Sequence, residues 1–328
     1  MTYNAGIIGV GIGLPERILS NSDLEKMVET SDEWITTRTG IKERRIAEAN
    51  IAASDLSSEA AHNAIKMAGI TPEDIDLIIV CTVTPDMMYP STAAIVQGNI
   101  GAVNAAAFDL SAGCTGFIYG VTSAAQFIRT GFFKNILVIG CDVLSRVTDF
   151  TDRNTCVLFG DGAGAAVISR TDEAGIIDEY IKADGTGGNY LHLPAGGSRK
   201  PASKETVENR EHFTRMEGAE VFKFAVKAMP DAVHKLLEKT SFDVSDIDYL
   251  IPHQANIRII ESAAKRLGMP MDKVGISIDR FGNMSSASIP VTLFEEYHKG
   301  NIKAGDKIVI VGFGAGLTYG AIMLNWLI

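Results

Sequence analysis

The feature that most constrains this chain is a pattern that occurs twice at a fixed spacing. An acidic turn followed by an apolar run at 71–80 returns at 243–251, and a second apolar run at 136–140 returns at 308–312. In both copies the second segment starts 65 residues after the first. Short apolar runs that follow acidic turns are typical of buried strands. The spacing therefore predicts that one mixed α/β unit has been duplicated.

The duplication divides the chain into halves at 1–170 and 171–328. A chain of 328 residues is long enough to bury a large core, and its continuous apolar strands suit sheets that are covered on both faces by helices. Between the halves, residues 171–216 are rich in Gly, Asp, Lys and Glu and have little periodicity. We expect surface loops there and assign them no chemistry.

Composition narrows the classes of function. The formal net charge of −10 argues against a nucleic-acid-binding protein, because affinity for nucleic acid comes largely from cationic side chains. No segment reaches the roughly 18 uninterrupted apolar residues of a membrane helix, and the first residues lack the regions of a signal peptide. The four cysteines lack metal-ligand spacing and are interpreted as free thiols. We therefore expect a cytoplasmic protein with no metal, no nucleic-acid partner and no membrane partner.

One of the four cysteines stands in a setting that favours reactivity. Cys114 lies in Ser111-Ala-Gly-Cys-Thr-Gly-Phe117, after a predicted strand and at the beginning of a predicted helix. Unpaired backbone N–H groups and the helix dipole stabilise a thiolate, so we expect the pKa of Cys114 to lie below the ordinary value of about 8.5. The alternative is a buried structural cysteine, which is how we interpret Cys81, Cys141 and Cys156.

A histidine and an asparagine occupy comparable places in the second copy. His253 lies in Pro252-His-Gln-Ala-Asn256, directly after a predicted strand, and Asn283 lies in Gly282-Asn-Met-Ser-Ser-Ala-Ser288. A lone histidine is more often structural, and Gly-Asn alone is only a turn signal. Pseudo-symmetry of the two copies, however, predicts that these loops meet the loop of Cys114. Together they offer a thiol nucleophile and two neutral donors for a developing oxyanion.

The trio resembles the Cys-His-Asn set of the β-ketoacyl-acyl-carrier-protein synthase III family, which belongs to the thiolase superfamily. The resemblance runs nearly end to end and includes Ser31-Asp-Glu-Trp-Ile35 and Phe159-Gly-Asp-Gly-Ala-Gly-Ala165. Asn283 is the most diagnostic residue, because elongating synthases use a second histidine and thiolases a second cysteine. The resemblance implies an α/β fold in which duplicated mixed sheets form α-β-α-β-α layers.

The same resemblance implies the initiating condensing enzyme of type II fatty-acid synthesis. Acyl-coenzyme A would load Cys114, and malonyl-acyl-carrier protein would then condense with loss of CO2 to give a 3-oxoacyl-carrier protein. His253 and Asn283 would stabilise the enolate. The backbone N–H groups of Cys114 and Ala315 would form the oxyanion hole of the loading step, and Phe313 would gate access to the cysteine. No cofactor is implied.

A substrate arm is expected near the N-terminus. Trp34 and Arg38 are four residues apart, which places them on one face if the stretch is helical, and an indole and a guanidinium suit an adenine and its phosphates. A surface Trp packed on an aliphatic stem is the alternative. By resemblance, Arg153 completes a coenzyme A clamp. The resemblance also implies that the pantetheine tunnel is lined by Gly218, Phe222 and Asn256.

Two further contacts are implied by the resemblance. Tyr89 falls where the family places an acyl-pocket residue from the other subunit of a homodimer, which suggests a short acyl chain of two to five carbons. The acidic carrier protein needs a local basic surface on this acidic chain. Arg258 matches the family's docking arginine, Lys265 lies on the same predicted helix face, and Lys223 extends it. Solvated helix faces are the alternative for these cations.

Three rival functions make different demands on these residues. A related synthase of secondary metabolism keeps the fold and changes the acceptor. A non-catalytic module that binds coenzyme A or a carrier protein predicts the loss of Cys114, His253 or Asn283, all of which are present. A cysteine hydrolase does not explain Asn283. We therefore favour the acyltransferase.

Overall fold

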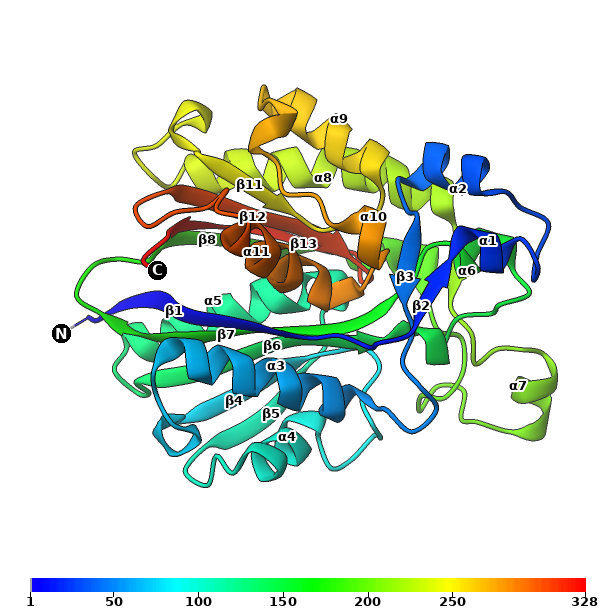
Figure 1. Cartoon of the computed structure of the whole chain (residues 1–328), viewed down its shortest axis with the longest axis horizontal. Helices are drawn as coiled ribbons and strands as arrows, with labels where there is room; N and C mark the ends of the chain where they lie inside the picture. Colours follow the sequence, from blue (N-terminus) through cyan, green and yellow to red (C-terminus); the bar gives the residue numbers. More distant parts are fainter. Residues whose placement is uncertain (1) are drawn as a thin grey trace.

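Two mixed sheets form the core of the computed structural model, which describes residues 2–328 (Figure 1). The first sheet has the order β1 (Asn4–Gly13), β7 (Asp161–Thr171), β6 (Asn135–Val143), β4 (Leu77–Cys81) and β5 (Ala106–Leu110). The second has the order β11 (Tyr249–Pro252), β12 (Lys307–Gly314), β13 (Thr318–Asn325) and β8 (Ile176–Ala183). Strands β2 (Ile18–Ser20) and β3 (Glu43–Arg45) form one small ladder, and β9 (Leu191–His192) and β10 (Arg215–Met216) form another.

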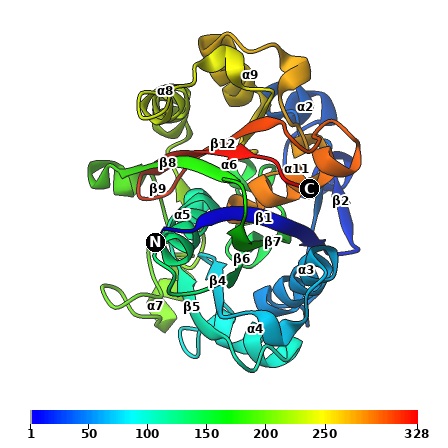
Figure 2. The same cartoon turned by 90° about the vertical axis from the view of Figure 1, so that its left-hand side faces the viewer.

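Helices complete a five-layer arrangement. Helices α5 (Gly116–Arg129) and α11 (Ser288–His298) lie between the sheets, where their apolar residues join one buried cluster (Figures 1 and 2). Helices α3 (Ala53–Ala68) and α4 (Thr92–Ile100) cover the outer face of the first sheet, and α8 (Gly218–Leu237) and α9 (Ile257–Leu267) that of the second. The short helices are α1 (Asn21–Leu24), α2 (Asp32–Thr39), α6 (Arg153–Cys156), α7 (Lys204–Glu208) and α10 (Ile278–Phe281). The predicted α-β-α-β-α class is confirmed. Within the described residues, no helix combines the length and the apolar character needed to cross a membrane.

The duplication is visible in the strand register. Strands β4 and β6 pair in parallel with Leu77 opposite Ile136, and β11 and β12 pair in parallel with Tyr249 opposite Ile308. Both pairs of opposed residues are 59 apart in sequence. The 3-10 turn Gly113–Thr115 and the 3-10 turn Ser285–Ala287 are likewise related by the 172-residue shift that relates the strands. The two turns are therefore equivalent positions in the two copies.

The division of the chain at 170/171 stays a prediction. Strand β7 of the first sheet ends at Thr171, and β8 of the second sheet begins at Ile176. The expectation of surface loops throughout 171–216 is wrong for part of that segment, because β8 pairs with β13 along the edge of the second sheet. An edge strand with several solvent-facing side chains has a mixed composition, and this hides it from a search for apolar runs.

Candidate active site

Cys114 sits in the turn between β5 and α5, against the hairpin of β12 and β13. The end of β12 passes so close that a Cβ atom on Gly314 would lie 2.5 Å from the Cys114 backbone nitrogen. The backbone N–H groups of Cys114 and Ala315 both interact with the Cys114 thiol. The fold thus brings the two predicted oxyanion donors to the Cys114 sulfur.

The expected low pKa of Cys114 is wrong. The residue is 8% exposed, and its removal from water raises the pKa of the thiol to about 12. The Ser285 hydroxyl and the two backbone N–H groups act in the opposite direction without offsetting burial. Desolvation disfavours the charged form of any acid, and here it exceeds the effect of the helix start at Gly116. The resting side chain is therefore a neutral thiol.

His253 is a buried, neutral imidazole at the end of β11. Its backbone N–H donates to the carbonyl of Val311 at 2.8 Å, which fixes the residue beside β12. Its side chain has no hydrogen-bond partner among residues 2–328. The residue is 1% exposed, and burial lowers the pKa of the imidazole to about 3. The ring can therefore donate an N–H to a ligand while carrying no charge.

Asn283 presents one end of its carboxamide to the site. Its backbone N–H donates to Leu158 at 2.9 Å, and its carbonyl accepts from the Gly160 N–H at 3.0 Å. The side-chain Oδ1 accepts from the Ser285 N–H at 2.8 Å. Because Oδ1 is held by the backbone, Nδ2 is the end that is free to donate to a substrate oxygen.

Cys114 lies where two cavities meet. One cavity, of about 160 Å³, also contains His253, Asn283 and Phe313. The other, of about 170 Å³, extends away from the two donors and is mainly apolar. Its apolar lining includes Val83, Leu144, Val147, Phe159, Leu191 and Leu193. The structure therefore brings the predicted nucleophile, the two donors and the gating residue to one place and adds a separate apolar chamber.

Several residues at these cavities were not singled out from the sequence. Ser285 lies in the quoted Gly-Asn motif, where a serine by itself indicates only a turn. Leu191, Leu193 and Met216 come from the segment that was assigned no chemistry. That segment has no periodicity that could have placed them, since they reach the site only through the path of the folded chain.

The aromatic and basic residues of the predicted coenzyme A clamp do meet. The guanidinium carbon of Arg153 lies 4.5 Å from the centroid of the Trp34 ring, and that of Arg38 lies 5.8 Å from it. An Arg153 N–H donates to the carbonyl of Glu29 at 2.9 Å, which holds the side chain in place. The exposed faces of both arginines leave them available to a phosphate group.

The three predicted tunnel residues line the cavity that holds His253. Gly218 begins α8 and Phe222 lies one turn further along the same helix. Asn256 caps α9 by accepting from the Arg258 N–H at 2.9 Å, and its Nδ2 donates to the Arg38 carbonyl at 3.0 Å. Asn256 thus ties the helix of the clamp to the helix that follows His253.

The predicted basic surface is less uniform than its sequence suggested. The Arg258 guanidinium lies 5.8 Å from the centroid of the Phe222 ring, and therefore beside the cavity that Phe222 lines. Lys265 is exposed on the same helix. Lys223, in contrast, forms an ion pair with Glu220 at 2.6 Å, which reduces the positive charge that it offers to a partner.

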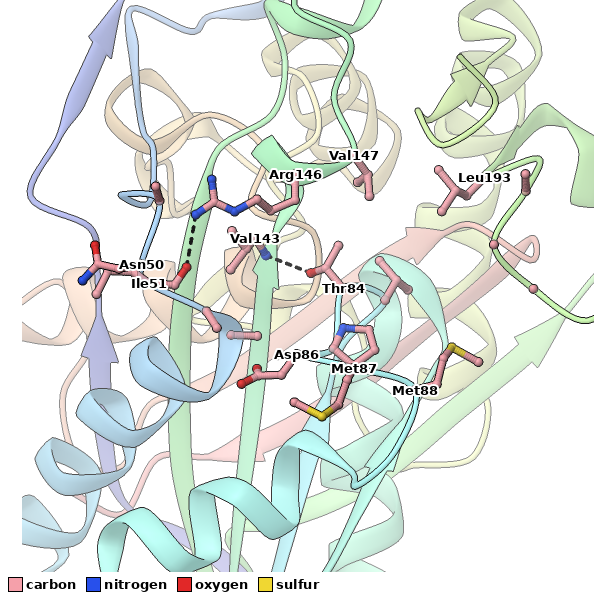
Figure 3. Close-up of a pocket in the computed structure, with 18 residues that line it drawn as sticks. Asn50, Ile51, Thr84, Asp86, Met87, Met88, Val143, Arg146, Val147 and Leu193 are labelled. Atoms are coloured by element: carbon pink, nitrogen blue, oxygen red, sulfur yellow. Dashed lines mark hydrogen bonds between the residues drawn. The ribbon is translucent and has the colours of Figure 1, made fainter. Parts of the chain in front are cut away.

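Tyr89 does not line either cavity around Cys114. It is 85% exposed and follows Met87 and Met88, which are 50% and 79% exposed. These two methionines border a wider, open cavity of about 640 Å³ (Figure 3). Leu193 lines both this open cavity and the apolar chamber of Cys114. Tyr89 therefore has no place in the acyl pocket of its own chain.

The layered, duplicated architecture, with the candidate site at the junction of the two copies, defines a thiolase-fold enzyme. Family profiles described as 3-oxoacyl-[acyl-carrier-protein] synthase III match residues 108–185, and those of its C-terminal part match 237–326. The β-ketoacyl-[acyl-carrier-protein] synthase III of Caldanaerobacter subterraneus is 60% identical over 98% of both chains, and that of Clostridioides difficile is 57% identical over 99% of both.

Solved structures of related synthases have the same fold as this chain. The 3-oxoacyl-[acyl-carrier-protein] synthase III of Aquifex aeolicus is 44% identical with a TM-score of 0.91, covering 98% of this chain and 100% of the other. The priming β-ketosynthase of the R1128 polyketide pathway is 35% identical with a TM-score of 0.93, covering 99% and 97%. The chain belongs to the β-ketoacyl-acyl-carrier-protein synthase III family. It is an acyltransferase, the condensing enzyme that initiates fatty-acid synthesis. Within residues 2–328, no group of three His, Cys, Asp or Glu side chains is arranged to hold a metal ion.

Proposed function

We propose that the protein transfers a short acyl group from acyl-coenzyme A to Cys114 and condenses it with the malonyl group of malonyl-acyl-carrier protein. The observation that carries this proposal is the position of Cys114 at the meeting point of an apolar chamber and a cavity with two neutral donors. One chamber suits the acyl chain and the other the reacting thioester. The reaction needs no metal or redox cofactor.

In the loading step, the Cys114 sulfur attacks the carbonyl carbon of the acyl thioester. The oxygen of that carbonyl becomes an oxyanion, which the backbone N–H groups of Cys114 and Ala315 stabilise. Donors of this kind contribute because they are fixed before charge develops. Coenzyme A leaves as its thiolate, and the acyl chain stays in the apolar chamber.

In the condensing step, loss of CO2 from the malonyl thioester leaves an enolate. A neutral His253 N–H and the Asn283 Nδ2 donate to the enolate oxygen. Neutrality matters because a protonated histidine would form an ion pair with the malonyl carboxylate. Such a pair would stabilise the carboxylate and slow the loss of CO2. The enolate carbon then attacks the acyl carbon on Cys114, and the carbon–sulfur bond breaks. Phe313, which contacts His253, separates the two half-reactions.

The proposed substrate contacts begin outside the cavity and continue along it toward Cys114. Trp34, Arg38 and Arg153 hold the adenine and phosphates of coenzyme A. Its pantetheine arm passes Gly218, Phe222 and Asn256. Arg258 and Lys265 receive the acidic carrier protein, with a smaller part for Lys223. The small volume of the apolar chamber supports an acyl chain of two to five carbons.

We assign the protein a homodimeric state and a cytoplasmic location. Strand β5 forms an edge of the first sheet, and its Phe108 is 38% exposed. The exposed apolar segment Met87–Tyr89 lies beyond the neighbouring strand β4. Burial of both against a second copy would bring Tyr89 to the partner's acyl chamber. Light scattering at micromolar concentration tests this, and a particle of the monomer mass, 35.2 kDa, would contradict it.

Mass spectrometry tests the central proposal. After mixing with acetyl-coenzyme A, we expect an acetyl adduct on Cys114 that disappears when malonyl-acyl-carrier protein is added and 3-oxoacyl-carrier protein forms. Cys114→Ala is the control and should carry no adduct. If wild-type protein acquires no adduct from any acyl-coenzyme A of two to five carbons, the proposal is wrong.

A further inference from the structure

Arg44 is a fully buried cation whose hydrogen-bond acceptors are all neutral. It lies on β3 with 0% exposure. Its Nη1 donates to the Leu19 carbonyl at 3.0 Å, its Nη2 donates to the Val157 carbonyl at 2.9 Å, and both nitrogens donate to Asn21 Oδ1 at 2.9 and 3.0 Å. Removing a guanidinium from water without a carboxylate to pair it is costly. A buried cation of this kind therefore calls for a role beyond the stability of the fold.

Asn21 carries the contact of Arg44 onward to helix α2. Asn21 is 1% exposed. Its Nδ2 donates to Asp32 Oδ1 at 2.8 Å, to the Ile41 carbonyl at 2.8 Å and to Thr36 Oγ1 at 3.3 Å. Asp32 and Thr36 belong to α2, and Ile41 follows its end. Because Oδ1 faces the two nitrogens of Arg44 and Nδ2 faces acceptors, a single orientation of the amide satisfies both of its ends.

The guanidinium also holds the end of helix α6. Val157, which accepts from Arg44 Nη2, is the C-cap of α6, and Arg153 is the first residue of that helix. The next residue, Leu158, accepts from the Asn283 N–H at 2.9 Å. The segment that follows α6 is therefore fixed both by Arg44 and by the loop of Asn283.

These contacts give the two helices of the coenzyme A clamp a second connection. The first is direct, since the guanidinium carbon of Arg153 lies 4.5 Å from the centroid of the Trp34 ring. The second runs through hydrogen bonds of 2.8 to 3.0 Å between, in order, Asp32, Asn21, Arg44 and Val157. Figure 1 shows β3, α1, α2 and α6 together at one end of the molecule. Arg44 thus helps to set the separation of Trp34 and Arg153.

We propose that Arg44 is a positioning residue for the coenzyme A clamp. It acts through Asn21 and Val157 on the two helices that carry Trp34 and Arg153. A clamp that already has its binding geometry loses less freedom when the substrate binds, and this raises affinity. The planar fork of a guanidinium suits the task, because it reaches acceptors on three separate segments at once.

This inference rests on the proposed function, because it assumes that Trp34 and Arg153 bind coenzyme A. Its test compares two acyl donors. Acetyl-coenzyme A offers its adenine and phosphates to the clamp, whereas acetyl-pantetheine has the same thioester and arm without them. Mass spectrometry of the Cys114 adduct gives the loading rate at each donor concentration. The ratio of the two second-order rate constants, here called the coenzyme A advantage, reports on the clamp, because a general loss of folded protein lowers both rates equally.

Two variants break the connection in different ways. Arg44→Lys keeps the charge, but a single ammonium cannot span the three acceptors. Asn21→Asp still accepts from Arg44, and gives it a counter-ion, but no longer donates to α2. In each variant we expect the coenzyme A advantage to fall by about threefold or more, through a higher KM for acetyl-coenzyme A, while loading from acetyl-pantetheine changes little.

Arg45→Lys is the matched control. Arg45 is the next residue on β3, and its Nη1 donates to the carbonyls of Pro15 and Glu16, both at 3.3 Å. This variant should keep the wild-type coenzyme A advantage. The inference is overturned if a folded Arg44→Lys or Asn21→Asp variant keeps that advantage, or if Arg45→Lys lowers it equally.

Trp34→Ala separates this failure from a failure of the proposed function. We expect it to lower the coenzyme A advantage at least as much as Arg44→Lys does, because it removes the aromatic face of the clamp itself. If Trp34→Ala lowers the advantage and Arg44→Lys does not, only the role of Arg44 is refuted. If Trp34→Ala leaves the advantage unchanged, the clamp is refuted and the role of Arg44 with it.

Discussion

The ring of Phe313 meets the imidazole of His253 edge to face, with their centroids 5.6 Å apart. Both residues are almost fully buried, at 3% and 1% exposure. Burial explains the neutrality of the histidine, since a protonated imidazole away from water, with no hydrogen-bond partner among residues 2–328, has nothing to compensate its charge. A donor that stays neutral at every physiological pH is thus a consequence of packing.

The buried imidazole makes stability depend on pH in a known direction. The folded pKa of His253, about 3, lies below the ordinary 6.5, so the unfolded chain binds more protons below pH 6.5 and stability falls as pH falls. Between pH 7 and pH 5 this histidine should cost about 2 kcal/mol of unfolding free energy. Urea titrations of the wild type and His253→Gln should show that the variant lacks this part of the loss. His234→Gln, on an exposed face of α8, should keep it.

The two half-reactions should respond differently to loss of the neutral donors. His253→Ala and Asn283→Ala should each lower the condensation rate by about 10²-fold or more, because each removes a donor to the enolate oxygen. Loading of Cys114 should fall much less, since its oxyanion is bound by backbone N–H groups. Burst-phase acylation and product formation, measured separately, check this. Equal losses in both steps would assign these residues to loading as well.

The clamp residues should act on substrate binding. Trp34→Ala and Arg153→Ala should each raise KM for acyl-coenzyme A about fivefold, which corresponds to about 1 kcal/mol of binding free energy. The value of kcat should change little. Steady-state kinetics with varied acyl-coenzyme A measure this. The KM for malonyl-acyl-carrier protein serves as the internal control and should not move, because the carrier arm has no adenine. A fall in kcat alone would contradict the assignment.

Charge reversals at Arg258 and at Lys223 form a matched pair of tests for the basic surface beside the cavity. Arg258→Glu should weaken use of malonyl-acyl-carrier protein by about 1 kcal/mol or more, and added salt should reduce the difference. Lys223→Glu should have a smaller effect, because Lys223 is already paired with Glu220 at 2.6 Å. Carrier-dependent kinetics at two salt concentrations test both. Loading from acyl-coenzyme A should be intact in each variant, and an equal loss there would place the docking surface elsewhere.

Tyr89 should influence acyl-chain choice if it reaches the partner's chamber. Tyr89→Ala should shift the preference toward longer acyl-coenzyme A substrates, since a large side chain would no longer close the pocket. The measurement is the ranking of kcat/KM over straight chains of increasing length. Phe132→Ala, at another exposed aromatic residue, should leave the ranking unchanged. An unchanged ranking in Tyr89→Ala would remove that residue from the pocket.

The sequence by itself determined the duplication, the layered fold class and the three residues that meet at the candidate site. It did so because apolar runs and turn motifs are local patterns, and because the spacing between two such patterns recurs. The repeated segments start 65 residues apart in each copy, and the opposed residues of each parallel strand pair are 59 residues apart in each copy. Both equalities follow from the same duplication. The resemblance to a family then assigned those residues their expected roles.

Only the tertiary structure decided their electrostatic states. The helix start predicted an acidic Cys114, but burial by chain segments distant in sequence raises its pKa instead. Desolvation and long-range contacts depend on the packing of the whole chain, which is why the chemistry of the site had to be read from the fold.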